Sequence, residues 1–336
     1  MMARVQGGLS GLKWSSAPDR KAERLLTSSA GNAVCACGAV VAEQRERADF
    51  TRARTSTGGR DEAVPLTKYE KVKDIMRGMD RVVVAFSGGV DSTLLLKAAL
   101  DALGPDRVLA VTADSETYPT REMEEAVKIA GQLGARHRVI RTSELDIPGY
   151  KENTPSRCYF CKQNLFQHLQ EFIRKEGYTH IVYGLIMDDM GEHRPGYKAA
   201  VEQGVRGPLQ EAGLYKQEIR ELSRMMGLPT WDKPSFACLS SRIAYGEMIT
   251  QEKLTRVERA ESFIMSLGIR QVRVRTHDNI ARIEVEPDDM PKLLSRREEV
   301  ANALASYGYT FVTMDLGGYK SGNLNKMLAD RNGVRV

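Results

Sequence analysis

Short apolar segments alternate with amphipathic ones along the middle of the chain. Apolar runs predict strands over 81–86, 107–112, 137–142 and 179–183, and apolar positions at helical spacing predict helices over 68–79, 92–103, 120–133, 162–175 and 216–226. Continuous apolar runs of four to six residues suit strands that are buried on both faces, as in a parallel sheet covered by helices. The pattern therefore predicts an α/β fold built on a parallel sheet.

The pattern changes near residue 240. It predicts a helix over 251–267, strands over 272–276 and 280–286, a helix over 288–307 and a strand over 310–315. Residues 277–279, between the first two strands, are typical of a hairpin turn. We expect a parallel-sheet domain at 63–239 and a smaller α+β domain at 240–330, which binds substrate or supports oligomerisation.

Residues 1–62 show neither the apolar period of a strand nor that of a helix, and they carry ten basic and seven acidic side chains. Such a composition buries too little apolar area to offset the entropy of ordering, so we expect a disordered extension, or a non-native one produced by a start codon placed too far upstream. The acidic residues argue against a transit peptide. Cys35 and Cys37 in this segment are interpreted as incidental thiols.

Charge, hydrophobicity and cysteine content argue against several classes of protein. The net charge is +5, and residues 63–336 carry 39 basic and 37 acidic side chains, which argues against a nucleic-acid partner. No apolar run approaches the roughly 20 residues of a membrane helix. Five cysteines are too few for a disulfide scaffold and no secretory signal is present, so we expect a cytoplasmic protein without a membrane partner.

A glycine turn joins the strand over 81–86 to the next helix, in the sequence VVVAFSGGVDST. Gly88 and Gly89 allow the backbone to approach an anion, and Ser87, Ser92 and Thr93 add hydroxyl groups beside a helix N-terminus. The segment predicts a phosphate cradle. It lacks the lysine with which a Walker loop holds a γ-phosphate. A glycine turn that binds nothing remains the alternative.

Three cysteines outside the extension have a spacing that suits a metal. Cys158 and Cys161 are three positions apart just before the helix predicted at 162–175, and Cys238 lies in the linker before residue 240. Inert buried thiols and a structural zinc are the alternatives.

Acidic and basic residues near these motifs are candidates for binding. Asp114 ends the second strand, at the sheet edge where such folds bind nucleotides. Arg273 and Arg275 alternate along one strand and so share a face, and Arg242 follows the third cysteine. Arginine favours planar recognition of carboxylate and phosphate. An exposed basic face is the alternative.

The motifs together resemble the LarE family of PP-loop sulfur transferases over about residues 64–325. The resemblance rests on the segments SGGVDST, SRCYFCK, RPGYKAAVEQGVRGPLQEAGLYKQEIREL, GLPTWDKPSFACLSSRIAYGEMIT and RVRTHDNIARIEV. It implies a PP-loop ATP pyrophosphatase domain. It also implies that ATP adenylylates a carboxylate of pyridinium-3,5-biscarboxylic acid mononucleotide and that sulfur then displaces AMP, a step in making the nickel-pincer cofactor of lactate racemase.

The resemblance also implies roles for particular residues. Asp91 would organise Mg²⁺ and pyrophosphate, beside an ATP site formed by Ser87, Gly88, Gly89, Ser92, Thr93 and Asp114. The substrate would be bound by Arg242, Arg273, Arg275 and Glu261. One departure is the stretch Gly184-Leu-Ile-Met-Asp188-Asp189, which keeps the family's acidic pair and lacks its asparagine.

Members of this family differ in their sulfur source. One type sacrifices a single cysteine, which matches Cys238, and the other holds a [4Fe-4S] cluster on three cysteines. Cys158, Cys161 and Cys238 are all present here, so the resemblance implies the cluster type, with one iron free to carry a sulfide. In either type Cys238 would be central to sulfur transfer. We also expect a homo-oligomer that works with other pincer-cofactor maturation proteins.

Three alternatives to this function remain open. A tRNA thiolase combines a PP-loop with cysteine-held clusters, but the near-neutral charge of residues 63–336 disfavours it. Amidating PP-loop ligases need an ammonia source and not three cysteines. A non-catalytic nucleotide- or cluster-binding module predicts that pyrophosphate release does not depend on an acceptor.

Overall fold

The computed structural model describes residues 63–190 and 195–327. The expectations for residues 1–62, among them the extension without regular structure and the incidental thiols, lie outside the described residues. In the described part, no helix is both long and apolar enough to cross a membrane.

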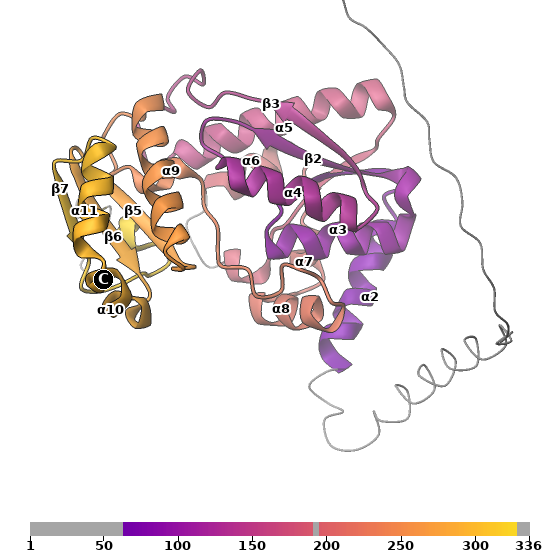
Figure 1. Cartoon of the computed structure of the whole chain (residues 1–336). Coiled ribbons are helices and arrows are strands. Elements are labelled where there is room, and N and C mark those ends of the chain that lie inside the picture. Colours follow the sequence, from indigo (N-terminus) through magenta and orange to yellow (C-terminus); the bar gives the residue numbers. More distant parts are fainter. Residues whose placement is uncertain (1–62, 191–194, 328–336) are drawn as a thin grey trace, which may run out of the picture. The chain divides into compact units, whose positions relative to one another are not determined.

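Four parallel strands form the first sheet, in the spatial order β3-β2-β1-β4. Figure 1 shows β2 and β3 side by side in this sheet. The strands are β1 (Val82–Ala85), β2 (Val108–Asp114), β3 (Arg136–Arg141) and β4 (His180–Tyr183). Val83 of β1 is in register with Leu109 of β2 and with Ile181 of β4, so β1 is an inner strand. The predicted α/β fold with a parallel sheet is confirmed.

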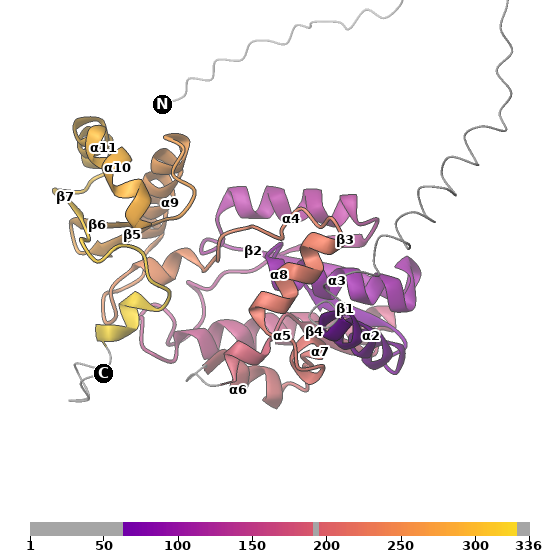
Figure 2. The ribbon, with the colours of Figure 1, turned by 90° about the horizontal axis from the view of Figure 1, so that it is seen from below.

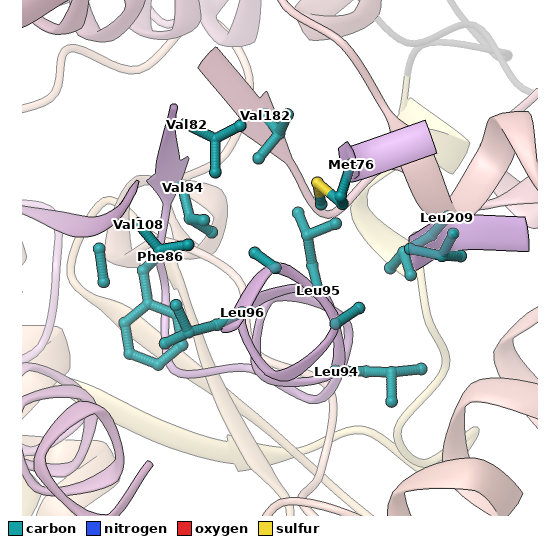
Figure 3. Packing of buried hydrophobic residues seen from close by; sticks show 14 of the residues in the cluster. Met76, Val82, Val84, Phe86, Leu94, Leu95, Leu96, Val108, Val182 and Leu209 are labelled. Carbon is teal, nitrogen blue, oxygen red and sulfur yellow. The ribbon is translucent and has the colours of Figure 1, made fainter. Parts of the chain in front are cut away.

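Helices cover both faces of this sheet. They are α2 (Ala63–Arg77), α3 (Val90–Leu103), α4 (Thr120–Gln132), α5 (Arg157–Glu176), α6 (Pro195–Glu202), α7 (Pro208–Glu211) and α8 (Lys216–Met225). Val82 and Val84 pack in one core with residues of α2, α3, α4 and α8, whereas Val83 packs in a second core with Phe166 of α5. Figure 3 shows Val82 and Val84 beside Leu95 of α3, and Figure 2 shows α4 and α5 on opposite sides of the sheet. The alternation along β1 thus explains its unbroken apolar sequence.

All four parallel strands end at the same edge of the sheet. The chain continues from β1 into Ser87, from β2 beyond Asp114, and from β4 into Gly184. Because β2 and β4 flank β1 on its two sides, segments that are distant in sequence surround the glycine turn. Ligands of open α/β sheets bind at this edge.

A second, mixed sheet follows the linker. Its strands are β5 (Val272–His277), β6 (Ile280–Val285) and β7 (Phe311–Met314), in the order β5-β6-β7. β5 and β6 form the predicted antiparallel hairpin, with Asp278 at φ +52° in the turn, and β7 runs parallel to β6. The helices α9 (Gln251–Ser266), α10 (Met290–Ser295) and α11 (Arg297–Ser306) accompany it. This sheet has its own apolar core, which includes Val274 and Ile283.

Several predicted boundaries are wrong. The single helix predicted over 288–307 is divided at Arg296 into α10 and α11, because residues 294–299 are all exposed and offer nothing to the core between Leu293 and Val300. The short helices α6 and α7 were not expected. α5 begins at Arg157 and not at residue 162, because the buried Arg157 side chain is held by Asn153 one turn earlier.

Candidate active site

The glycine turn connects β1 to α3 through a conformation that requires glycine. Gly88 has φ +61°, and a Cβ placed there would lie 2.9 Å from Cβ of Ala126. Gly89 is the N-cap residue of α3, and no side chain among the described residues accepts a hydrogen bond from the N–H groups at this helix start. A Cβ at Gly184, after β4, would lie 3.1 Å from the Ser92 nitrogen. The three glycines thus let the turn sit close to α4 and β4 with its backbone N–H groups near a helix start.

The hydroxyl groups of the turn stabilise its shape. Ser92 Oγ donates to the Gly89 carbonyl oxygen at 3.1 Å and accepts from the Ser87 backbone nitrogen at 3.3 Å. Tyr118 donates to the Ser87 carbonyl oxygen at 2.7 Å. Thr93 is fully buried. Ser87 is exposed, so of the three hydroxyl residues proposed for ATP it is the one that a ligand reaches without rearrangement.

Asp91 forms an ion pair that the sequence did not predict. Lys216 Nζ, at the first residue of α8, lies 2.9 and 2.8 Å from the two carboxylate oxygens of Asp91. Burial raises the pKa of Asp91, and Lys216 opposes that shift. The backbone nitrogen of Lys216 donates to Asp188 Oδ2 at 2.8 Å, so one member of the acidic pair after β4 orients the start of α8. A lysine that opens a helix is too common a pattern to have revealed this contact.

Asp114 lies at the end of β2, half-buried, and its backbone oxygen accepts from the Thr142 nitrogen at 2.9 Å. Its carboxylate makes no hydrogen bond or ion pair within the described residues. It is therefore available to a ligand at the sheet edge.

The linker that carries the third cysteine passes directly beside the glycine turn. Lys233 Nζ donates to the Gly88 carbonyl oxygen at 3.0 Å and pairs with Glu122 and Glu125 of α4 at 2.8 and 2.9 Å. Further along, the Leu239 backbone nitrogen donates to the Thr117 carbonyl oxygen at 2.8 Å. Cys238 therefore lies between two residues, Lys233 and Leu239, that contact the loops at the carboxyl edge of the first sheet. Lys233 is a second residue that sequence reasoning missed.

Cys158 and Cys161 lie within the first turns of α5, and not before the helix as expected, and Cys238 immediately precedes the 3₁₀ turn η3 (Leu239–Arg242). All three are free thiols. Burial raises the pKa of Cys158, and the next largest contribution is the charge of Cys238. Burial and then Glu144 raise the pKa of Cys161, with smaller contributions from Cys238 and Cys158. Arg157 Nη1 donates to the Ser240 carbonyl oxygen at 2.9 Å, so the start of α5, which carries Cys158 and Cys161, contacts the η3 turn that follows Cys238.

The donor set of this thiol site, Cys158, Cys161 and Cys238, suits a soft metal or an iron–sulfur cluster. Across residues 63–190 and 195–327, no three His, Cys, Asp or Glu side chains are arranged around a point that would hold one metal ion. A [4Fe-4S] cluster binds its thiolates on different irons, so its ligands do not converge on a single point. The thiols of these three residues fit the ligand chemistry of an iron–sulfur cluster.

The arginines proposed for substrate binding are buried and differ in their partners. Arg242 pairs with both carboxylate oxygens of Glu261, each at 2.9 Å, and Arg275 pairs with Glu284 at 2.8 Å. Arg273 instead donates to the carbonyl oxygens of Val272, at 2.8 Å, and Ser235. Burial and the charge of Arg242 lower the pKa of Arg273 to about 10. In the part of the chain that the structure describes, Arg273 has no carboxylate in an ion pair and can accept an anion.

A cavity of about 350 Å³ brings part of this set together. Its lining includes Lys233, Phe236, Arg242, Glu261 and Arg273, from the linker, α9 and β5. Arg275 does not line it, because its guanidinium faces Glu284 and the Ser241 carbonyl oxygen. Lys233 both lines this cavity and contacts the Gly88 carbonyl oxygen of the glycine turn.

Comparison with known proteins agrees with this geometry. The family model described as NAD synthase matches residues 67–240. An uncharacterized protein of Synechocystis is 43% identical over 264 residues, covering 78% of this chain and 98% of that protein. Pyridinium-3,5-bisthiocarboxylic acid mononucleotide synthase of Lactiplantibacillus plantarum is 39% identical over 262 residues, covering 78% and 95%. An NH₃-dependent NAD⁺ synthetase of Hyperthermus butylicus is 31% identical over 196 residues, covering 56% and 69%.

The match to the NAD synthase model spans more than half of the chain, and each of the two longer matches covers 78% of it. The chain therefore belongs to the NAD synthase family of PP-loop enzymes and, within it, to the LarE-type sulfur transferases.

Proposed function

We propose that this protein uses ATP to convert the carboxylates of pyridinium-3,5-biscarboxylic acid mononucleotide into thiocarboxylates, with a three-cysteine [4Fe-4S] cluster as sulfur carrier. The observation that supports this most strongly is the linker from Lys233 to Cys238, which contacts the phosphate turn at one end and carries a thiol at the other. Similarity to the synthase of Lactiplantibacillus plantarum supports the choice of acceptor.

In the first half-reaction, a carboxylate oxygen of the acceptor attacks the α-phosphorus of ATP, and the bond from that phosphorus to pyrophosphate breaks. The backbone N–H groups of the turn and Ser87 would bind the pyrophosphate. Lys216 pairs with Asp91 in the structure. When Asp91 binds Mg²⁺ instead, the ammonium group of Lys216 would be free to contact the phosphates of ATP. Mg²⁺, held by Asp91, would supply charge neutralisation for the leaving group.

In the second half-reaction, a sulfur nucleophile attacks the carbonyl carbon of the acyl adenylate and AMP leaves with the electron pair of the broken C–O bond. The cluster would supply that sulfur when bound to Cys158, Cys161 and Cys238. Arg273 would hold an anionic group of the acceptor, since its guanidinium is buried and no carboxylate pairs with it among the described residues. Three free thiols suit a reducing compartment such as the cytoplasm.

The test is a turnover assay with the purified chain, Mg²⁺, ATP and the dicarboxylate nucleotide under anaerobic conditions. We expect AMP and pyrophosphate in equal amounts only when the acceptor is present, together with a thiocarboxylate product seen by mass spectrometry. Pyrophosphate release that is independent of the acceptor would contradict the proposal and favour a nucleotide-binding module.

A further inference from the structure

Phe236 is a half-buried aromatic side chain in the linker, between Lys233 and Cys238. In the part of the chain that the structure describes, it belongs to none of the four apolar cores. It instead lines the cavity of about 350 Å³ that Arg242 and Arg273 also line. Burial in a core therefore does not account for this ring, whereas contact with a ligand in a cavity of this size would.

The lining of the cavity suits a flat ligand that carries both signs of charge. Five of the lining side chains are basic and five are acidic, so the lining as a whole is close to neutral. Among the described residues that line the cavity, Phe236 is the one aromatic side chain. A ring with a cationic centre and carboxylate substituents would find a partner for each of its parts on such a surface.

Two aromatic contacts hold the Phe236 ring in place. The ring of Tyr118 lies at an interplanar angle of 85° to it, with the ring centres 5.5 Å apart, and Tyr118 donates to the Ser87 carbonyl oxygen at 2.7 Å. Cζ of Arg242 lies 5.9 Å from the centre of the Phe236 ring, within the range of a cation–π contact. Arg242 is itself held by both carboxylate oxygens of Glu261. Phe236 is therefore an oriented ring, tied through Tyr118 to the glycine turn.

Arg273 provides an anion-binding group beside this ring. It is 8% exposed, and its guanidinium donates to the carbonyl oxygens of Val272 and Ser235. Because Ser235 directly precedes Phe236, the guanidinium lies next to the segment that carries the ring. Within the described residues no carboxylate pairs with Arg273, so an anionic substituent of a ring stacked on Phe236 can bind there.

We propose that Phe236 is the recognition surface for the pyridinium ring of the acceptor, which stacks on the part of the phenyl ring that lines the cavity while an anionic substituent binds Arg273. The positive charge of the pyridinium ring is attracted to the electron-rich face of the phenyl ring. This inference rests on the proposed function for the identity of the acceptor. It adds the residue that distinguishes a cationic ring from a neutral one.

The experiment compares two nucleotides by isothermal titration calorimetry on the full chain, without ATP. One is pyridinium-3,5-biscarboxylic acid mononucleotide. The other is its carbon analogue, in which a benzene ring replaces the pyridinium ring and the carboxylates and phosphate are unchanged. Because the anionic groups contribute to both affinities, the ratio of the two dissociation constants reports recognition of the ring charge, and its change between variants completes a thermodynamic cycle.

We expect the wild type to bind the pyridinium nucleotide roughly three- to tenfold more tightly than the carbon analogue. This preference should disappear in Phe236→Leu and persist in Phe236→Tyr. Incorporation of 3,4,5-trifluorophenylalanine in place of Phe236 keeps the shape of the ring but withdraws electrons from its face, so it should also abolish the preference. The fluorinated chain keeps the experiment decisive if Phe236→Leu does not fold. A preference that survives in both Phe236→Leu and the fluorinated chain overturns the inference.

Two further variants act as controls. Phe172→Leu removes a ring that also has an arginine over it, Arg138 at 5.0 Å, but that does not line the cavity, so the wild-type preference should remain. Glu258 lines the cavity and, among the described residues, forms no ion pair, so its carboxylate is the rival partner for the ring charge. A preference that is lost in Glu258→Gln and kept in Phe236→Leu assigns the ring charge to Glu258 and refutes the inference.

These outcomes separate the inference from the proposed function, because binding is measured without turnover. Equal affinities of the wild type for the two nucleotides refute the inference alone. Binding of neither nucleotide by the wild type contradicts the proposed acceptor, and the inference with it.

Discussion

The ammonium group of Lys233 lies 3.0 Å from the carbonyl oxygen of Gly88, although the two residues are 145 positions apart in the chain. Lys233 is buried and at the same time neutralises Glu122 and Glu125 of α4. The contact places the linker that carries Cys238 against the phosphate turn. It is the physical link between the two half-reactions that we propose.

Replacing Lys233 by Met should destabilise the protein by about 3 kcal/mol, because the buried Glu122 loses its strongest partner. Glu122 retains Arg121 at 2.8 Å, so the loss should not exceed that of a fully isolated buried charge. Urea unfolding measures the change. Lys175→Met is the control, since Lys175 forms an exposed pair with Glu171 and should change stability by less than about 0.5 kcal/mol. Equal effects of the two variants would contradict the role given to Lys233.

Asp91→Asn should abolish acceptor-dependent pyrophosphate release while leaving the fold intact. The substitution keeps the shape of the side chain but removes the charge that Lys216 and the proposed Mg²⁺ share. Pyrophosphate release and circular dichroism together measure this. Asp106→Asn, at an exposed position after α3, should behave as the wild type. An Asp91→Asn protein with full pyrophosphate release would remove Asp91 from the ATP site.

Arg273→Gln should lower kcat/KM for the dicarboxylate nucleotide about 10- to 100-fold, the effect of losing one charged hydrogen bond to an anion. The KM for ATP should change little, because Arg273 lines the cavity on the side of β5. Steady-state kinetics with each substrate varied separately make the distinction. Arg259→Gln, an exposed position on α9 outside the cavity lining, is the control. An equal rise in both KM values would argue against a specific anion site at Arg273.

The Arg242–Glu261 pair should make the free energy of unfolding depend on pH in the acidic range. Burial, the largest single influence, raises the pKa of Glu261, but Arg242 together with Arg273 and the Val274 N–H group lowers the pKa overall. A carboxyl whose pKa is lower in the folded state stabilises the fold above the pKa of the unfolded chain, about 4.3, and that contribution is lost as the pH falls through the folded value. Urea unfolding between pH 7 and pH 3 measures the slope.

In Glu261→Gln this part of the pH dependence should disappear, and stability at pH 7 should fall by about 3 kcal/mol because Arg242 is left buried without a counter-charge. Glu252→Gln, at a highly exposed position of the same helix, should keep the wild-type slope. An unchanged slope in Glu261→Gln would show that the pair does not titrate as described.

The elements that the sequence predicts correctly are those with local causes. The turn from β1 to α3 follows from an apolar strand, two glycines and a helix start within a dozen residues. The hairpin between β5 and β6 likewise depends on its own two-residue connection, Asp278 and Asn279. The resemblance to a known family also placed Arg242, Arg273 and Glu261 in one set, and the structure brings these three to one cavity.

The contacts that the sequence could not predict join residues far apart in the chain. Lys216 reaches Asp91 over 125 positions, and Lys233 reaches Gly88 over 145. Neither lysine has a local pattern that distinguishes it from a surface lysine, since the partner is set by the strand order. The same applies to Arg275, whose spacing with Arg273 suggested a shared ligand, while Glu284 on the neighbouring strand takes its charge.

The most direct test of the account is a single-turnover experiment on Cys238→Ala with ATP, Mg²⁺ and the dicarboxylate nucleotide. The turn and the thiols serve separate half-reactions, so we expect acceptor-dependent pyrophosphate release and an acyl adenylate, but no thiocarboxylate. The intact mass of the wild-type chain, measured before and after turnover, should be unchanged if a cluster carries the sulfur. A folded Cys238→Ala protein that still forms thiocarboxylate, or that releases no pyrophosphate, would contradict the account.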